Sequence, residues 1–245
     1  METQRPFSLK EEKVPAYTDT HNRASSLSDI ILGGQDGLVN VLGVILGVAA
    51  ATQDPRIVLV AGLAAAFAES VSMGAVAYTS TLADADFYES ERAREYRHIE
   101  HSPHLEREEI QDIYREKGFK GDLLERIVNT ITASPDIWVA VMMAEEHRLT
   151  PVDRRTAARA AWVVGVSAII GSLIPLAPFA LLPVATSMWV SVLVTALVLF
   201  VGGVLKARLT VGRPTRSGLE MAVIGTLSAM VGYGVGILFK IPATF

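Results

Sequence analysis

Two carboxylates stand inside long apolar stretches of the chain. Asp36 follows Ile30 to Gly34 and precedes an uncharged run to Ala51, and Glu69 interrupts an apolar run. A charged side chain at the centre of a bilayer costs at least about 2.5–3.5 kcal/mol on insertion scales. Such residues normally face water, a bound ion or a partner charge. With Met73 one helical turn after Glu69, the pattern predicts a membrane protein that moves a cation.

A second set of candidate ligands lies between residues 83 and 156, where Asp and Glu outnumber Lys and Arg. We call this segment the acidic unit. Carboxylates three or four residues apart share a helix face, and on facing helices they build iron and manganese sites. A solvated acidic face is the alternative, but two methionines one turn before a pair of acids favour metal. The candidates are Glu91, Glu95, Glu106, Glu109, Glu116, Met142, Met143, Glu145 and Glu146.

Five apolar segments must position these residues, because each is about long enough, at roughly 20 residues, to cross a bilayer. They are residues 28–52, 57–82, 157–177, 182–205 and 217–239. The chain is 50% hydrophobic over 245 residues, which is too apolar for an ordinary soluble domain. Small-residue pairs permit close helix approach, within one chain or between two copies; these pairs are Gly33/Gly37, Gly43/Gly47 and Gly232/Gly236.

The acidic unit is predicted to hold four short helices. The first covers residues 87–99 and is broken by Ser102-Pro103, and the second covers 105–117 with Gly118 as its stop. The apolar stripe of the third lies within 123–131, and Ser134-Pro135 starts the fourth. The predicted class is all-α, with a flexible tail (1–27), spans one and two (28–82), the acidic unit (83–156) and spans three to five (157–240).

Basic residues set the predicted orientation, because loops rich in Lys and Arg remain in the cytoplasm. They cluster before span one, between spans two and three, and between spans four and five. We therefore expect a cytoplasmic N-terminus and acidic unit, and an outer C-terminus. The chain has no cysteine, so a metal site would use carboxylate, imidazole, thioether or backbone oxygen ligands, which suit hard or borderline divalent ions.

Several charged or metal-ligating residues have a simpler interpretation. Asp29, Asp54 and Glu220 lie at span ends, where a structural role suffices. The run His98-x-x-His101-x-x-His104 resembles a ligand set, but Pro103 prevents one helix from presenting all three. We interpret this run as an accessory site at best.

The chain resembles the vacuolar iron transporter family. The resemblance rests on Gly34-Gln35-Asp36-Gly37-Leu38, on Ala68-Glu69-Ser70-Val71-Ser72-Met73-Gly74 and on the glutamate-rich stretch 109–119, and it extends over about residues 28–239. It implies five transmembrane helices, a homodimer with the ion path near its two-fold axis, and a cytoplasmic metal-binding domain. It also implies export of Fe²⁺ from the cytosol in exchange for protons, with Asp36 and Glu69 as pore carboxylates.

We therefore expect a transporter rather than an enzyme. Its partners would be the lipid bilayer, divalent ions, protons and a second copy, and not nucleic acid. No obligatory cofactor is expected; Fe²⁺, or Mn²⁺, Zn²⁺ or Co²⁺, would be substrate and bound ion. The predicted location is the cytoplasmic membrane of a prokaryote or the vacuolar membrane of a eukaryote.

Two other classes of function remain open from the sequence. A di-iron carboxylate oxidase would need a Glu-x-x-His pair on each of two helices, and only Glu95-Tyr96-Arg97-His98 supplies one. A membrane-tethered metal sensor would have no use for carboxylates inside its spans.

Overall fold

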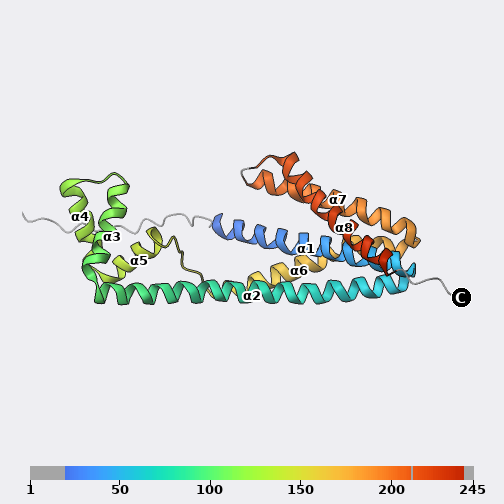
Figure 1. Cartoon of the computed structure of the whole chain (residues 1–245), viewed down its shortest axis with the longest axis horizontal. Helices are drawn as coiled ribbons and strands as arrows, with labels where there is room; N and C mark the ends of the chain where they lie inside the picture. The colour runs from blue at the N-terminus through green and yellow to red at the C-terminus, as the bar shows by residue number, and fades with distance from the viewer. Residues whose placement is uncertain (1–19, 211, 240–245) are drawn as a thin grey trace, which may run out of the picture.

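The computed structural model describes residues 20–210 and 212–239 as a set of α-helices (Figure 1). The helices of this described part are α1 (Thr20–Thr52), α2 (Pro55–His101), α3 (Pro103–Glu116), α4 (Gly121–Thr132), α5 (Pro135–Glu145), α6 (Thr156–Leu181), α7 (Val184–Leu209) and α8 (Pro214–Leu238). Five of them, α1, α2, α6, α7 and α8, are long and apolar enough to cross a membrane. The pair α4 and α5 also meets this criterion when joined, although it is bent by 112°. The all-α class with multiple membrane-spanning helices is confirmed.

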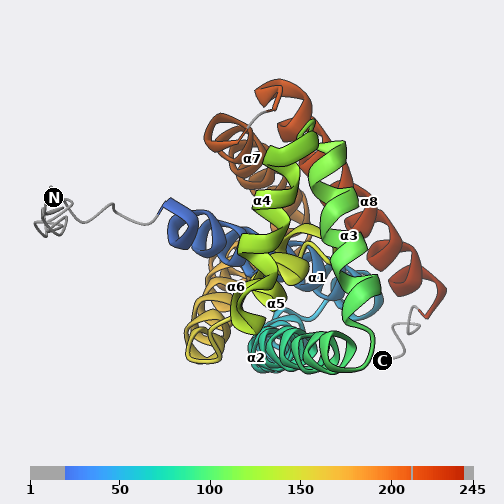
Figure 2. The ribbon, with the colours of Figure 1, turned by 90° about the vertical axis from the view of Figure 1, so that its left-hand side faces the viewer.

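Helix α1 is the central element of the bundle, because it packs against α2, α6, α7 and α8 (Figures 1 and 2). Its buried side chains, Leu42 and Ile45 among them, form a core with Val58 of α2 and Leu176 of α6. The outer faces carry large exposed apolar side chains, such as Trp189 at 75% exposure. Lipid tails would cover such a surface, as expected for a span that is apolar on its outer side.

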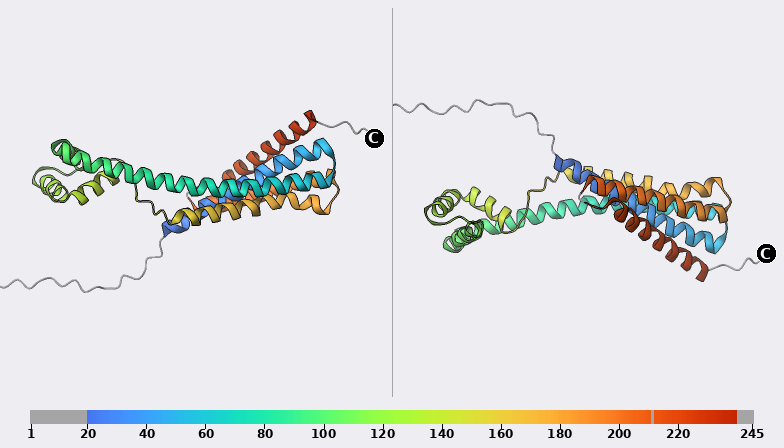
Figure 3. Two further views of the ribbon diagram at one scale, coloured as in Figure 1. Left: turned by 90° about the horizontal axis from the view of Figure 1, so that it is seen from below. Right: turned by 90° about the horizontal axis from the view of Figure 1, so that it is seen from above.

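The acidic unit lies apart from the bundle, at the end of a long extension of α2 (Figures 1 and 3). Helices α3, α4 and α5 fold against this extension around a core that includes Ile110, Val128 and Trp138. The predicted break at Ser102-Pro103 is confirmed, since α2 ends at His101 and α3 begins at Pro103. Gly118 has φ +99° and ends α3 as predicted.

The second span and the first helix of the acidic unit were predicted as separate elements, and this was wrong. They form one continuous helix of 47 residues, Pro55–His101. The chain has no Pro or Gly between Ala75 and Ser102, so no residue interrupts the helix where it leaves the apolar stretch. The second span and the acidic unit are therefore joined by continuous helix and not by a loop.

The predicted end of the third span was also wrong. This span was predicted to end at residue 177, but α6 continues through Pro175 and Pro178 to Leu181. Two hydroxyls of α7 support this stretch: Ser191 Oγ donates to the Pro175 carbonyl at 2.7 Å and Ser187 Oγ to the Pro178 carbonyl at 3.0 Å. Prolines are tolerated in membrane helices where neighbouring side chains bind the backbone in this way.

The small-residue pairs all pack within the chain. Gly33 and Gly37 of α1 face backbone carbonyls of α6, and a Cβ on either would lie 2.2 Å from one of them. A Cβ on Gly232 or Gly236 of α8 would lie 2.1 Å from the carbonyl oxygen of Gly43 or Gly47 respectively. These glycines therefore allow close contact between helices of the same chain, and not between two copies.

The start of α1, the start of α6 and the junction between α7 and α8 all lie at the end of the bundle nearer the acidic unit (Figure 1). The turn between α1 and α2 lies at the opposite end. The predicted tail falls outside the described residues over 1–19, and from Thr20 the chain is helical. Arg213 and Arg216 thus share one end of the bundle with Arg154 and Arg155.

Candidate metal sites

The first candidate site lies inside the bundle, where α2 meets α1. Glu69 is only 8% exposed, and neither of its carboxylate oxygens has a hydrogen-bond partner. Asp36 and Asn40 of α1 are within electrostatic reach of the Glu69 carboxylate, although neither makes a hydrogen bond of regular geometry with it. The structure thus brings the two predicted carboxylates together. Met73 is half-buried one turn further along α2.

Asn40 was not among the predicted residues of this site. Its position four residues after Asp36 in an apolar span was the signal for it, because the two side chains share one face of a helix. Both Asp36 and Asn40 are exposed on the surface of the single chain. A carboxylate and an amide that face lipid would be costly, so this face requires a polar or protein covering.

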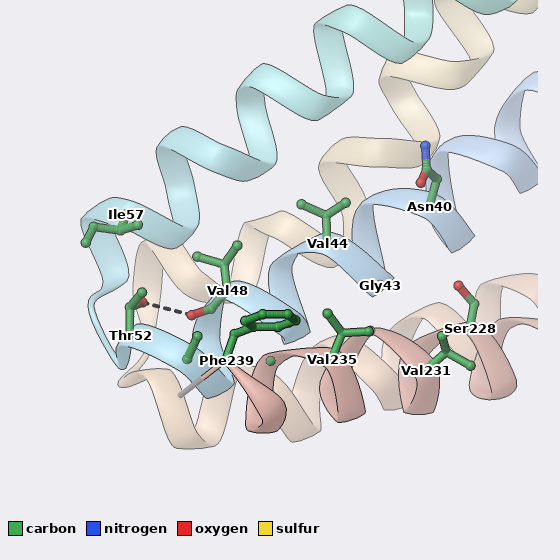
Figure 4. A pocket seen from close by; sticks show the side chains of 14 residues that line it. Asn40, Gly43, Val44, Val48, Thr52, Ile57, Ser228, Val231, Val235 and Phe239 are labelled. Atoms are coloured by element: carbon green, nitrogen blue, oxygen red, sulfur yellow. Dashed lines mark hydrogen bonds between the residues drawn. The ribbon is translucent and has the colours of Figure 1, made fainter. Parts of the chain in front are cut away.

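A groove of about 650 Å³ runs along the same face, between α1 and α8 (Figure 4). Asn40 lies at one end of it and Phe239 at the other, with Val44 and Val235 between them. Most of its lining is small or apolar. Asn40, Thr52 and Ser228 are the polar side chains of this mostly apolar groove.

The second candidate site lies in the acidic unit, where α2, α3 and the end of α5 meet. Glu95 of α2 is 1% exposed and Glu106 of α3 is 5% exposed, and each has a buried Oε2 without a hydrogen-bond partner. Two triads of possible ligands, Glu95–Glu146–His147 and Glu95–His98–Glu106, have ligand atoms within 4.8 Å of one another. We call Glu95, His98, Glu106, Glu109, Glu146 and His147 together the Glu95 cluster.

Burial and crowding of like charges perturb the carboxyls of this cluster. Burial, and then the nearby Glu109 and Glu95, raise the pKa of Glu106 to about 7. Burial also raises the pKa of Glu109, with Glu146 and Glu95 adding to the effect. Carboxylates crowded in this way favour a neutralising proton or cation. Since metal ligands must be deprotonated, a bound cation would displace these protons.

The remaining predicted ligands lie outside the two triads. Glu91 pairs with Arg94 at 3.0 Å, and Glu145 pairs with Lys117 at 2.5 Å. Glu116 is exposed near the end of α3. Glu91 and Glu145 are thus partly buried acids with basic partners, and none of the three belongs to a triad.

The two predicted thioether ligands are buried. Met142 belongs to the apolar core of the acidic unit with Ile110 and Trp138, and Met143 is 1% exposed. Packing is a sufficient role for Met142. Both lie at the end of α5, about one helical turn before the cluster residue Glu146.

His147 was missed in the sequence, although its Nε2 lies 3.0 Å from Glu95 Oε1. The three-histidine run separates as Pro103 predicts. His98 remains on α2 with its Nδ1 3.3 Å from Glu106 Oε1. His101 and His104 are exposed, and the His101 ring nitrogen Nδ1 lies 2.7 Å from the Arg97 carbonyl oxygen.

Three acids predicted to be structural have the surroundings expected of that role. Asp54 caps the start of α2, accepting from the backbone N–H of Arg56 at 2.8 Å. Glu220 accepts from Arg216 Nε at 2.9 Å at the start of α8. Asp29 lies near the start of α1 and within electrostatic reach of Arg159.

These features define a polytopic helical membrane protein with two neighbouring carboxylates on its first two spans and an acidic helical unit between its second and third spans. The model of the VIT family matches residues 27–237. The chain belongs to the VIT family, and it is accordingly of a transporter family rather than an enzyme.

Proteins named vacuolar iron transporter resemble it over most of its length. Vacuolar iron transporter 2 of Oryza sativa subsp. japonica is 33% identical over 237 residues, which cover 94% of this chain and 96% of that protein. Vacuolar iron transporter 1 of Arabidopsis thaliana is 31% identical, covering 91% of this chain and 90% of that protein. The vacuolar iron transporter of Plasmodium falciparum (isolate 3D7) is 29% identical, covering 91% and 86%.

Proposed function

We propose that the chain carries a divalent metal ion, Fe²⁺ or Mn²⁺, out of the cytosol in exchange for protons. The observation that carries this proposal is Glu69, a buried carboxylate with no hydrogen-bond partner, next to Asp36 and Asn40 in the bundle. The names of the relatives supply iron as the first ion to test. The di-iron oxidase and the sensor are not supported by these relatives.

The exchange follows from the chemistry of two carboxylates in membrane spans, the buried Glu69 and the neighbouring Asp36 on α1. An uncompensated charge is costly away from water, so we expect each carboxylate to hold a proton or a cation in turn. A divalent ion that binds them displaces protons, and its release on the other side lets protons return. Cation and proton therefore occupy the same ligands in turn, and no nucleotide is needed. Met73 could contribute a thioether that favours Fe²⁺ over Ca²⁺ or Mg²⁺.

The acidic unit, in this proposal, faces the cytosol and collects the ion for the bundle. Its side is inferred from the basic residues at the same end of the bundle, Lys206, Arg208, Arg213 and Arg216. The continuous helix α2 carries both Glu95 and Glu69, and so it connects the collecting site with the path. The N-terminus would then be cytoplasmic.

A second copy of the chain would complete the path. Asp36 and Asn40 are exposed within an apolar span, and Asn40 lines the mostly apolar groove between α1 and α8 (Figure 4). If the same face of the partner packs there, four polar groups face one another around a two-fold axis. The membrane would be vacuolar in a eukaryote and cytoplasmic in a prokaryote.

The test is metal flux in proteoliposomes with an imposed proton gradient, with Fe²⁺ under anaerobic conditions and Mn²⁺ in parallel. Asp36→Asn and Glu69→Gln are expected to abolish gradient-dependent flux, because each removes a carboxylate that must hold the cation. Glu220→Gln, an exposed acid of α8 in an ion pair, is the matched control and should retain flux. If Asp36→Asn or Glu69→Gln carried the same flux as wild type, the proposal would be overturned.

A further inference from the structure

The Glu95 cluster contains two imidazoles beside one buried carboxylate. His147 Nε2 lies 3.0 Å from Glu95 Oε1, and His98 Nδ1 lies 3.8 Å from the same oxygen. His98 Nδ1 is also 3.3 Å from Glu106 Oε1. Each triad of possible ligands thus holds one nitrogen beside its carboxylate oxygens, and Glu95 belongs to both.

Buried oxygen atoms at the same place lack partners. The Oε2 atoms of Glu95 and Glu106 are buried and accept no hydrogen bond, although the two residues are 1% and 5% exposed. Leaving a buried charged oxygen unpaired is costly, so these atoms are available to a cation. Glu106 has the further neighbours Glu109 and Glu146, which add negative charge without adding a hydrogen-bond donor.

The backbone after α5 is built to return His147 to this place. The N–H groups of Glu146 and His147 both donate to the Met142 carbonyl, and the N–H of Leu149 donates to the Met143 carbonyl. Arg148 has φ +54°, a left-handed conformation that costs a non-glycine residue energy. This turn closes α5 and directs the chain back along α2, and His147 is consequently only 17% exposed.

We propose that His98 and His147 are nitrogen ligands of the Glu95 cluster, each completing one of two cation positions that share Glu95. The proposal rests on the metal-collecting role proposed above and deepens it by assigning the class of ion. Mixed imidazole and carboxylate ligands suit Fe²⁺, Co²⁺ and Zn²⁺, whereas Mg²⁺, Ca²⁺ and Mn²⁺ are suited by oxygen ligands alone. The two histidines therefore make the acidic unit select Fe²⁺-like ions over Mn²⁺.

The test uses the full chain in detergent, loaded with Co²⁺ as an air-stable probe and with Mn²⁺ in parallel. In His98→Gln and His147→Gln the Co²⁺ affinity is expected to fall by about tenfold or more, which is the size of effect seen when a residue that supports a metal site is replaced. The Mn²⁺ affinity should change much less. His101→Gln and His104→Gln, which alter exposed histidines nearby, are the matched controls and should bind both ions as wild type does.

A histidine with a purely structural role would hold α5 on α2 through an ion pair with Glu95. Replacing it would also lower the metal affinity, so affinity measurements alone do not separate this role from that of a ligand. X-ray absorption of the Co²⁺-loaded protein separates the two roles, because a bound imidazole gives a distinct multiple-scattering signal. We expect that signal in wild type and its decrease in each histidine variant. Its absence from wild type would overturn the proposal, as would equal losses of Co²⁺ and Mn²⁺ affinity.

Glu95→Gln distinguishes this proposal from the one on which it rests. If wild type binds neither ion and Glu95→Gln changes nothing, the metal-collecting role of the acidic unit fails. If Glu95→Gln abolishes binding while the histidine variants bind as wild type without an imidazole signal, only the assignment of nitrogen ligands fails. Flux through Asp36 and Glu69 is measured separately and does not depend on either result.

Discussion

Glu91 and Glu95 lie one helical turn apart on α2, but their carboxylates have different surroundings. Glu95 is 1% exposed and belongs to both candidate triads, whereas Glu91 pairs with Arg94 and belongs to neither. We expect Glu95→Gln to lower metal affinity by about tenfold or more, because a shared ligand is lost. Glu91→Gln should leave it nearly unchanged. Calorimetric titration of the full chain with Mn²⁺ and Co²⁺ measures both, and equal losses in the two variants would contradict the assignment.

Glu106 gives the metal-free protein a dependence of stability on pH. Burial and neighbouring acids raise its pKa from 4.5 to about 7, so the native state holds a proton that the unfolded chain has already lost. The contribution of Glu106 to stability therefore falls as pH rises from about 4.5 to about 7.

Glu106→Gln removes this dependence, because the amide does not ionise. We expect its Tm, relative to that of wild type, to be higher at about pH 8 than at about pH 5. Thermal unfolding in the presence of a chelator measures the difference. Glu116→Gln, an exposed acid on the same helix, should show no such trend, and a constant offset for Glu106→Gln would refute the argument.

Some site residues could be predicted from the sequence because their spacing carries the information. Asp36 and Glu69 stand out as charges in apolar runs, and Glu95 and Glu106 as acids on short helices. His147 could not be found in this way, because its position depends on the turn at Arg148 and not on a repeat along a helix. Which glutamates are buried likewise depends on how α2, α3 and α5 meet.

At the scale of elements, the five apolar spans and the helical class could be predicted, while two boundaries could not, and with them the number of separate helices. The 47-residue α2 passes from apolar to charged residues without a helix breaker, so the change in composition does not mark an end of structure. The prolines of α6 are ordinary stop signals in sequence. Hydroxyls of the next helix, α7, bind the carbonyls of these prolines and stabilise the last turns of α6, a tertiary contact that no local pattern indicates.

The contact between α1 and α8 depends on glycines that have no room for a methyl group. A Cβ on Gly232 would lie 2.1 Å from the Gly43 carbonyl oxygen, whereas a Cβ on Gly234, two residues away, meets nothing within 4 Å. We expect Gly232→Ala to lower the Tm in detergent by about 4 °C or more, since overpacking forces the two backbones apart. Gly234→Ala should be neutral or slightly stabilising, because alanine favours helix. Equal effects of the two variants would show that this contact does not form.

At the scale of the whole molecule, the exposed polar face of α1 predicts a symmetric pair. Asp36 and Asn40 are exposed in an apolar span of the single chain, and a second copy would cover them. The chain has no cysteine, so single cysteines report on this face without other substitutions. Asn40→Cys should give a disulfide-linked dimer on mild oxidation in the membrane, because residues near a two-fold axis meet their own copies. Leu193→Cys, on the outer face of α7 at 69% exposure, should remain monomeric under the same conditions. A cross-link at Leu193 without one at Asn40 would place the interface on α7 and leave the carboxylates of the path facing lipid.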